Sequence, residues 1–300
     1  MKIGFIGLGK MGFNMTKRLL HSHEVVVYDV NDKLVSDAKA TGAIEASSIE
    51  DLISKLDSDP IVWMMVPSGE ITNKTISECI KHLKKNSILI DGGNSFYKDS
   101  LKRSKDLREK GIDFLDIGTS GGVWGLKEGY CLMVGGEKKA FDKIEPILKT
   151  LTSNDGYEYM GKSGSGHYVK MIHNAIEYGM MQAYAEGFDL LKSKKEFDLD
   201  LYKITNVWKK GSVVRSWLLD LISNVFKEDQ SLDNIKAYVE DSGEGRWSIN
   251  EAIEQNVSIP AITISLFERF SSRDEDNFKA KLLSSMRNQF GGHQMKKKGE

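Results

Sequence analysis

The sequence predicts an α/β fold, in which an N-terminal doubly wound sheet is followed by an all-helical C-terminal domain. Residues 1–150 hold 16 of the 28 glycines and three of the four prolines, and short apolar runs alternate there with helical stretches. This alternation is typical of βαβ units and a mainly parallel sheet. Residues 167–290 contain only five glycines and one proline, as expected of long helices.

The expected elements follow in order along the chain. Strands are expected at residues 2–6, 24–28, 61–66, 87–90, 113–116 and 131–134, each a short run rich in apolar residues. Helices are expected at residues 167–195 and 199–225, where long runs lack proline. The glycine- and serine-rich segment 161–166 separates the two patterns. We therefore expect domains at residues 1–162 and 163–300.

The balance of charge excludes one class of function. The chain carries 42 Lys and Arg against 43 Asp and Glu, a net charge of −1. General binders of nucleic acids or acidic membranes need a broad excess of positive charge. No apolar run reaches 18 residues, so no membrane span is expected. Glycines interrupt the apolar start of the chain, which does not fit a signal peptide. We expect a cytoplasmic protein.

Cysteine is too rare here for a disulfide scaffold. Cys79 and Cys131 are the two cysteines, and both lie in apolar contexts. Both are therefore expected to be buried thiols, with a single bridge as the alternative. The sequence has no CxxC motif and no Cys/His cluster, so no metal site is expected.

A glycine motif follows the first expected strand. Gly7, Gly9 and Gly12 fit G-x-G-x-x-G between a strand and a helix, the fingerprint of a Rossmann-type dinucleotide site. Asp29 lies 20 residues after Gly9, where a carboxylate accepts the ribose hydroxyls and repels the 2′-phosphate of NADP. Only Lys33 offers a nearby cation, so NAD is expected in preference to NADP. The alternative is an incidental glycine turn with a surface aspartate.

One helical face in the second domain is dense in reactive side chains. At about 100° per residue, five of them fall within an arc of about 140°: Lys170, His173, Asn174, Glu177 and Tyr178. A partly desolvated lysine can act as a base near neutral pH, and a glutamate beside an anionic substrate can act as an acid. The alternative is an ordinary solvated helix face.

The sequence resembles the 6-phosphogluconate dehydrogenase family, in its short, NAD-preferring form, within the β-hydroxyacid dehydrogenase superfamily. The resemblance spans essentially the whole chain. Its motifs are residues 5–12 (FIGLGKMG), 91–95 (DGGNS), 120–122 (SGG), 166–178 (GHYVKMIHNAIEY), 243–247 (GEGRW) and 287–293 (RNQFGGH). The glycine fingerprint is shared with the wider superfamily, whereas DGGN and K-x-x-H-N-x-x-E-Y are more specific.

The resemblance implies oxidative decarboxylation of 6-phosphogluconate to ribulose 5-phosphate and CO₂, as in the pentose phosphate pathway or gluconate use. It implies that Lys170 is the general base and Glu177 the general acid. The implied substrate residues are Asn94, Ser120, Gly121, Gly122, His173, Asn174, Tyr178, Arg269, Arg287 and His293. The implied NAD-binding residues are Gly7, Leu8, Gly9, Met11, Gly12, Asp29, Val66 and Asn94.

The family resemblance also implies an oligomer. In that family the C-terminal arginine and histidine reach the neighbouring active site, so Arg287 and His293 imply a homodimer or homotetramer. The phosphate loop departs from the family pattern, because Ser242 and Glu244 align where the long form carries a lysine and a threonine. Glu244 would repel a phosphate, so it should point away or pair with Arg246. Arg273 is a rival to Arg269 as the phosphate ligand.

Two other functions compete with this interpretation. The first is a β-hydroxyacid dehydrogenase for a small non-phosphorylated acid such as 3-hydroxyisobutyrate, which shares the glycine motif and the lysine. The second is a non-catalytic NAD-sensing protein, which would bind nucleotide without turnover. The intact pair Lys170 and Glu177 argues against the second, and the His173–Asn174 motif with the Arg287 tail argues against the first.

Overall fold

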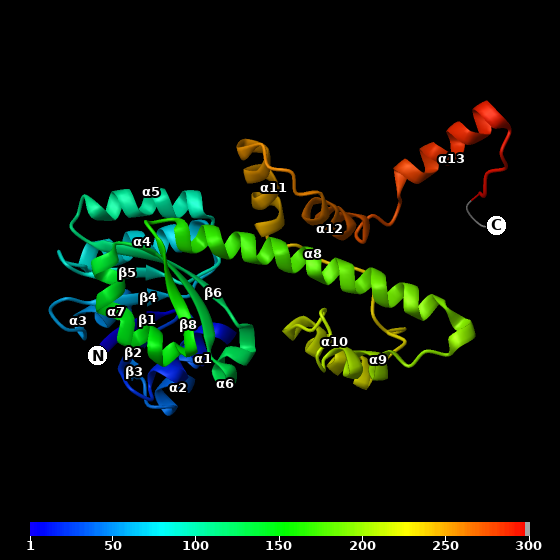
Figure 1. Cartoon of the computed structure of the whole chain (residues 1–300). Coiled ribbons are helices and arrows are strands. Elements are labelled where there is room, and N and C mark those ends of the chain that lie inside the picture. The colour runs from blue at the N-terminus through cyan, green and yellow to red at the C-terminus, as the bar shows by residue number, and fades with distance from the viewer. Residues whose placement is uncertain (298–300) are drawn as a thin grey trace. The chain divides into compact units, whose positions relative to one another are not determined.

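The computed structural model describes residues 1–297, apart from the side chain of Phe290. The chain forms two compact units, Met1–His173 and Asn174–Glu300. The division falls inside helix α8 (Ser165–Ser193), a single helix of 29 residues (Figure 1).

The first unit is built on one sheet of eight strands in the order β3-β2-β1-β4-β5-β6-β7-β8. All pairs are parallel except β6 with β7. This confirms the predicted mainly parallel sheet. The strands are β1 (Lys2–Ile6), β2 (Glu24–Tyr28), β3 (Ile44–Glu45), β4 (Ile61–Met64), β5 (Ile88–Asp91), β6 (Asp113–Ser120), β7 (Tyr130–Gly136) and β8 (Thr152–Gly161).

Apolar side chains from alternate strand positions form two cores in this unit. Phe5 and Trp63 belong to one cluster, whereas Ile6 and Met64 belong to the other. A strand whose successive side chains are all buried in this way is covered on both faces. The covering helices are α1 (Lys10–Leu19), α2 (Asp32–Ala40), α3 (Ile49–Ser54), α4 (Glu70–His82), α5 (Tyr97–Arg108) and α7 (Lys138–Leu151), with short turns η1 (Gly122–Trp124) and α6 (Gly125–Glu128).

The strand order creates a switch point between β1 and β4. The chain proceeds outward from β1 to β2 and β3, and then returns to place β4 on the other side of β1. Ligands of open parallel sheets bind in the crevice at the carboxyl ends of the strands at this point. The fold therefore places the cofactor site where β1 and β4 end.

The second unit is helical, as predicted, but one expected helix is divided. Residues 199–225 form α9 (Leu201–Trp208) and α10 (Trp217–Glu228) instead of one helix. Gly211 between them has φ +92°, and the Ser216 side chain caps α10 by accepting the Leu219 N–H. A left-handed glycine ends a helix and a serine cap begins the next, so the prediction of a single helix was wrong.

The remaining helices of the second unit are short. They are η2 (Lys195–Phe197), α11 (Glu244–Gln255), α12 (Pro260–Ser271) and α13 (Phe278–Gly291). A small core joins α8, α9 and α10 through Phe188, Leu201, Leu219 and Phe226. Helix α11 contacts α12. In the described part of the chain no helix is long and apolar enough to cross a membrane.

Strand β8 and the two-residue β3 were not predicted. β8 contains Asn154 and Asp155, which both have positive φ, followed by Gly156. This composition is typical of a turn, and only pairing with β7 keeps the segment in the sheet.

The prediction that both cysteines are buried was half right. Cys79 on α4 is fully buried, and burial raises the pKa of its thiol to about 12. Cys131 is exposed, because the alternate positions Leu132 and Val134 supply the core contacts of β7. Both cysteines are free.

Candidate active site

The turn after β1 has room for an anion. Gly7 has φ +95°, and a Cβ there would collide with the Met65 carbonyl. A Cβ at Gly12 would collide with the Gly7 carbonyl, so α1 packs directly on the turn. At Gly9 no described heavy atom lies within 4 Å of the Cβ position. Helix α1 begins here without a capping side chain or an acidic first turn, which leaves its first N–H groups available to a phosphate.

Asp29 follows β2 directly and holds this turn in place. Its Oδ2 accepts the Leu8 N–H at 2.6 Å, and its Oδ1 accepts the Asn31 N–H at 2.8 Å. Each carboxylate oxygen has a further lone pair, so Asp29 keeps the capacity to accept hydroxyl groups. Met11 lies in the first turn of α1, and Val66 follows β4. The predicted cofactor residues thus gather at the carboxyl ends of β1, β2 and β4.

Asn94 is presented between buried neighbours. It is exposed, while Gly93 and Ser95 beside it are buried. The segment follows β5, which is the neighbour of β4 in the sheet. Asn94 therefore stands at the same edge of the sheet as the glycine turn.

Ser120, Gly121 and Gly122 form the end of β6 and the start of η1. Gly121 has φ +120° and Gly122 has φ +52°. A side chain at Gly121 would be strained and would also press on the Tyr130 ring, 3.3 Å from its Cβ position. Glycine at these two positions lets the backbone turn sharply.

Lys170 is buried and lies against β6. Only 8% of it is exposed. A Cβ at Gly118 would collide with the Lys170 Cβ, and a Cβ at Gly166 would lie 2.5 Å from the Met133 carbonyl oxygen and 2.7 Å from the Gly135 nitrogen. Glycines at these three positions (118, 135 and 166) let α8 approach the sheet closely. Lys170 therefore contacts β6 at Gly118, two positions before Ser120.

A buried carboxylate fixes the start of α8. Asp116 on β6 accepts the Gly164 N–H at 2.7 Å and the His167 N–H at 3.0 Å. Burial raises the pKa of Asp116. The His167 ring is bonded through Nδ1 to the Ser100 hydroxyl at 2.7 Å. Ser100, His167 and Asp116 do not form a hydrolase triad, because Asp116 binds backbone N–H groups and all three residues are buried.

Asn174, Glu177 and Tyr178 on α8 belong to the second unit, where a polar network surrounds Tyr178. The Tyr178 hydroxyl accepts the Ser242 N–H at 3.0 Å. Glu244 is 1% exposed and accepts bonds from the Ser242 hydroxyl at 2.7 Å and the Asn174 amide at 2.8 Å. Glu177 is half-buried one position before Tyr178. His173, the last residue of the first unit, is also half-buried.

Two of the three arginines near Tyr178 share one carboxylate. Arg246 and Arg273 both pair with Asp241, whose side chain is 5% exposed, at 2.7 and 2.9 Å. Arg246 first, then Arg273, lowers the pKa of Asp241 to about 2. Arg269 instead stacks its guanidinium 3.5 Å from the Tyr178 ring centroid and donates to the Glu240 carbonyl. Arg269, not its rival Arg273, is therefore the guanidinium without a carboxylate partner in this network.

Arg287 and His293 are exposed at the end of the chain. Arg287 lies on α13, and the Asn288 amide donates to the His293 carbonyl at 2.9 Å. Neither joins the Tyr178 network within the described chain, so the structure of one chain does not assemble all the predicted substrate residues.

Comparison with known proteins identifies the family. Residues 2–161 match the NAD binding domain of 6-phosphogluconate dehydrogenase, and residues 166–298 match the C-terminal domain of the same enzyme. The chain belongs to the 6-phosphogluconate dehydrogenase family. The NAD(+)-dependent, decarboxylating 6-phosphogluconate dehydrogenase of Haloferax volcanii is 42% identical over 303 residues, covering 100% of both chains.

Two solved structures resemble this chain, one in both sequence and fold and the other in fold alone. The 6-phosphogluconate dehydrogenase of Plasmodium falciparum has a TM-score of 0.84 and 30% identity, covering 100% of this chain and 67% of that one. The 3-hydroxyisobutyrate dehydrogenase of Mycobacterium tuberculosis has a TM-score of 0.71 but 21% identity, covering 88% and 90%. The second likeness shows a shared fold alone.

The chain departs from the 6-phosphogluconate dehydrogenase family pattern at Glu244, and one of the two expected arrangements, its pairing with Arg246, is not formed. We expected Glu244 to point away or to pair with Arg246. Instead the carboxylate partner of Arg246 is Asp241, and Glu244 is buried against Ser242 and Asn174. A carboxylate in this position accepts hydrogen bonds, so it suits hydroxyl groups and amides better than phosphate oxygens.

Sequence reasoning missed the residues that position Lys170. Gly118, Gly135 and Asp116 were not singled out, although glycine inside a strand signals close backbone approach.

No group of three or more His, Cys, Asp or Glu residues among positions 1–297 is arranged to hold a metal ion.

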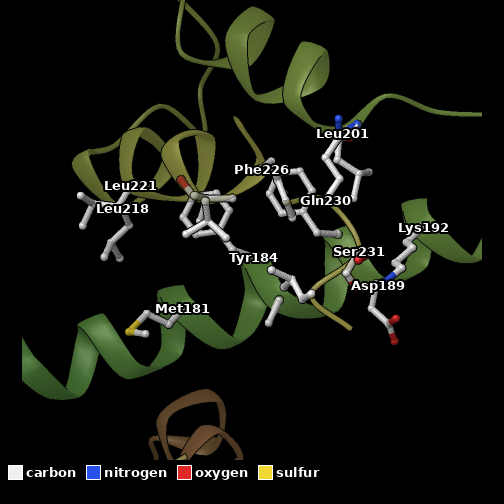
Figure 2. A pocket seen from close by; sticks show the side chains of 15 residues that line it. Met181, Tyr184, Asp189, Lys192, Leu201, Leu218, Leu221, Phe226, Gln230 and Ser231 are labelled. Atoms are coloured by element: carbon white, nitrogen blue, oxygen red, sulfur yellow. Dashed lines mark hydrogen bonds between the residues drawn. The ribbon is translucent and has the colours of Figure 1, made fainter. Parts of the chain in front are cut away.

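One large cavity of the second unit is not the predicted site. It has a volume of about 490 Å³ and is lined mainly by apolar side chains of α8 and α10, including Tyr184, Leu221 and Phe226 (Figure 2). None of the predicted site residues lines it.

Proposed function

We propose that this chain catalyses the oxidative decarboxylation of 6-phosphogluconate to ribulose 5-phosphate and CO₂ with reduction of NAD. One observation carries the proposal: Lys170 is buried against Gly118, two positions from Ser120, in a chain of the 6-phosphogluconate dehydrogenase family. The NAD(+)-dependent relative from Haloferax volcanii supports both the reaction and the cofactor.

The residues of the first unit fit a dinucleotide. The open space at Gly9 and the uncapped start of α1 suit the pyrophosphate. Asp29 suits the ribose hydroxyls and disfavours the 2′-phosphate of NADP. Gly7, Leu8, Met11, Gly12, Val66 and Asn94 would complete the contacts. When bound, the nicotinamide supplies an acceptor for the hydride of C3.

Lys170 would begin the reaction as a base. Its neutral amine takes the proton of the C3 hydroxyl as the C3 hydride leaves, and a 3-keto acid forms. The carbonyl is then β to the carboxylate, so the C1–C2 bond can break with its electron pair delocalised onto the carbonyl oxygen. Protonated Lys170 stabilises that developing charge. CO₂ leaves, and an enediol remains.

Glu177 would finish the reaction as an acid, by giving a proton to the carbon of the enediol that lost CO₂. Both groups belong to α8. Asn94, Ser120, Gly121, Gly122, His173 and Asn174 would hold the sugar acid. Tyr178 and Arg269 would bind the phosphate, since Arg269 lies on the Tyr178 ring and no carboxylate among residues 1–297 pairs with it.

The proposal extends to organisation and place in the cell. We assign dinucleotide binding to residues 1–162, and substrate binding with dimerisation to residues 163–300. The two family matches, 2–161 and 166–298, support this division. The cytoplasmic location stays a prediction of the sequence.

A substrate comparison tests the activity. Purified protein with NAD should form NADH and release CO₂ in equal amounts from 6-phosphogluconate, and should show no comparable rate with 3-hydroxyisobutyrate. Turnover of 3-hydroxyisobutyrate without 6-phosphogluconate activity would establish the rival dehydrogenase. NADH binding without turnover of either acid would establish the sensor.

We also propose that a homodimer, or a tetramer built from it, is the active form, with Arg287 and His293 acting in the neighbouring site. Helix α13 supports this. Phe278, Leu282 and Met286 recur at helical spacing and are 69%, 48% and 50% exposed, which leaves an apolar face uncovered by the described part of its own chain. Arg287 on this helix and His293 just beyond it are both exposed.

Subunit complementation tests this arrangement. Chains carrying Lys170→Met and chains carrying Arg287→Ala should each have low activity. Mixed and reassociated in equal amounts, they should regain about a quarter of the wild-type rate, because half of the dimers are mixed and each mixed dimer has one intact site. If Arg287 acted within its own chain, no activity would return.

A further inference from the structure

A buried ion pair lies directly behind the Asn94 segment. Arg103 on α5 donates from Nη1 to the Asp91 Oδ2 at 3.0 Å. The side chains of Arg103 and Asp91 are 7% and 0% exposed. A charged pair so deeply buried costs desolvation energy that a surface pair does not, so its presence calls for a reason other than general stability.

Asp91 is the anchor of the segment that presents Asn94. Its Oδ1 accepts the Gly93 N–H at 3.1 Å, and its Oδ2 accepts the Ser95 hydroxyl at 2.8 Å. The two residues on either side of Asn94 are therefore both bonded to one carboxylate. Any movement of that carboxylate moves both flanks of Asn94 together.

The segment has no free space in which to adjust. A Cβ at Gly92 would collide with the Trp63 indole nitrogen and lie 2.8 Å from the Met65 sulfur, and a Cβ at Gly93 would lie 2.8 Å from the Val66 carbonyl oxygen. The backbone thus rests directly on the end of β4. In such close packing, a shift of the anchor is transmitted and not absorbed.

Arg103 fixes the anchor from two sides. Its Nε donates to the Asn73 Oδ1 on α4 at 3.0 Å, while Nη1 holds Asp91. The planar guanidinium sets the direction of both bonds, which a flexible lysine ammonium cannot reproduce. Arg103 therefore ties the carboxylate of β5 to helices α4 and α5.

We propose that Arg103 is a positioning residue for the reaction, acting through Asp91 to hold Asn94 at the cofactor and substrate site. The proposal rests on the proposed function, because it gives Asn94 a role in the site. Arg103 itself touches neither substrate nor cofactor.

The first test compares two arginines of α5. Arg103→Met should lower kcat by about tenfold to a hundredfold, because displacing a site group by about 1 Å has effects of this size. It should also raise the KM for 6-phosphogluconate and the deuterium isotope effect with substrate labelled at C3. Arg108→Met is the matched control, since Arg108 pairs with Glu137 at the surface. It should leave all three parameters unchanged.

The isotope effect separates positioning from stability. If Arg103→Met only reduced the folded fraction, the apparent kcat would fall while KM and the isotope effect stayed at wild-type values, and the proposal would be overturned. Arg103→Lys should restore part of kcat, because it returns the charge to Asp91 without the bond to Asn73.

A second measurement guards against an unfolded variant. Asp91→Asn with Arg103→Met removes both buried charges, so its melting temperature should lie above that of either single variant. Its kcat should nevertheless remain as low as in the single variants. Recovery of wild-type kcat in this double variant would contradict positioning by the pair.

A mutant cycle with Asn94→Ala identifies the route. If Arg103 acts through Asn94, Arg103→Met should lower kcat little further once Asn94 is alanine. Multiplication of the two effects would overturn the proposal. If Asn94→Ala alone left kcat and both KM values unchanged, the assigned role of Asn94 in the proposed function would fail instead.

Discussion

Replacement of Lys170 by methionine is expected to lower kcat with 6-phosphogluconate by about 10²–10⁴-fold, the usual contribution of a general base. Methionine keeps the length and most of the volume of the side chain, so the contact of its stem with Gly118 is retained. What it removes is the amine that we propose takes the hydroxyl proton and later stabilises the enolate oxygen. Both chemical steps lose their catalyst in one substitution.

The affinity for NADH should remain within about threefold of the wild-type value, because the residues assigned to the dinucleotide lie on α1 and in the segments that follow β1, β2, β4 and β5, and not on α8. Titration of protein fluorescence with NADH measures it. Lys162→Met is the matched control, since Lys162 is exposed shortly before α8 begins, and it should keep full kcat. A Lys170→Met variant with more than a tenth of wild-type kcat would refute Lys170 as the base.

Replacement of Asp29 by asparagine is expected to weaken NAD and improve NADP. A hydrogen bond to a charged group contributes about 1.5–3 kcal/mol, so the KM for NAD should rise by roughly tenfold to a hundredfold. Asparagine keeps one carbonyl oxygen for the turn but removes the negative charge that repels the 2′-phosphate. The ratio of kcat/KM for NAD to that for NADP should therefore fall by at least about tenfold.

The structure makes this test discriminating, because Asp29 also binds the Leu8 and Asn31 N–H groups. If Asp29 served only to hold the glycine turn, kcat/KM for both cofactors would fall in parallel and their ratio would not move. Asp37→Asn is a suitable control, because Asp37 is a surface partner of Lys33 on α2. It should leave both cofactor constants unchanged.

The fold of the first unit can be predicted from the sequence, because the local preferences of its segments for strand, turn and helix agree with the way these segments pack. A glycine turn between an apolar strand and a helix, followed by an acidic residue after the next strand, is typical of the dinucleotide-binding βαβ unit. The failures have local causes. Asn154 and Asp155 favour a turn, yet pairing with β7 keeps them in β8. Gly211 and Ser216 divide a stretch that lacks proline and otherwise favours helix.

The candidate site was predictable as a set of residues and not as an arrangement. Helical spacing predicts that Lys170 and Glu177 lie on one helix, and both belong to α8. Spacing cannot show which arginine is already paired, and it was the buried carboxylate of Asp241 that distinguished Arg273 from Arg269. Such pairings depend on which elements pack together, so they are not encoded in any short stretch of sequence.

The contact between Gly118 and Lys170 limits how this enzyme can be altered. A single methyl group on the strand would occupy the space of the lysine stem. The position of Lys170 therefore depends on the absence of a side chain at Gly118. Directed evolution toward other hydroxy acids should therefore accumulate changes at Asn174, Ser242 and Glu244, while position 118 tolerates no replacement. The packing of Lys170 on β6 is therefore fixed within the first unit, whereas positions 174, 242 and 244 on the second unit are open to change.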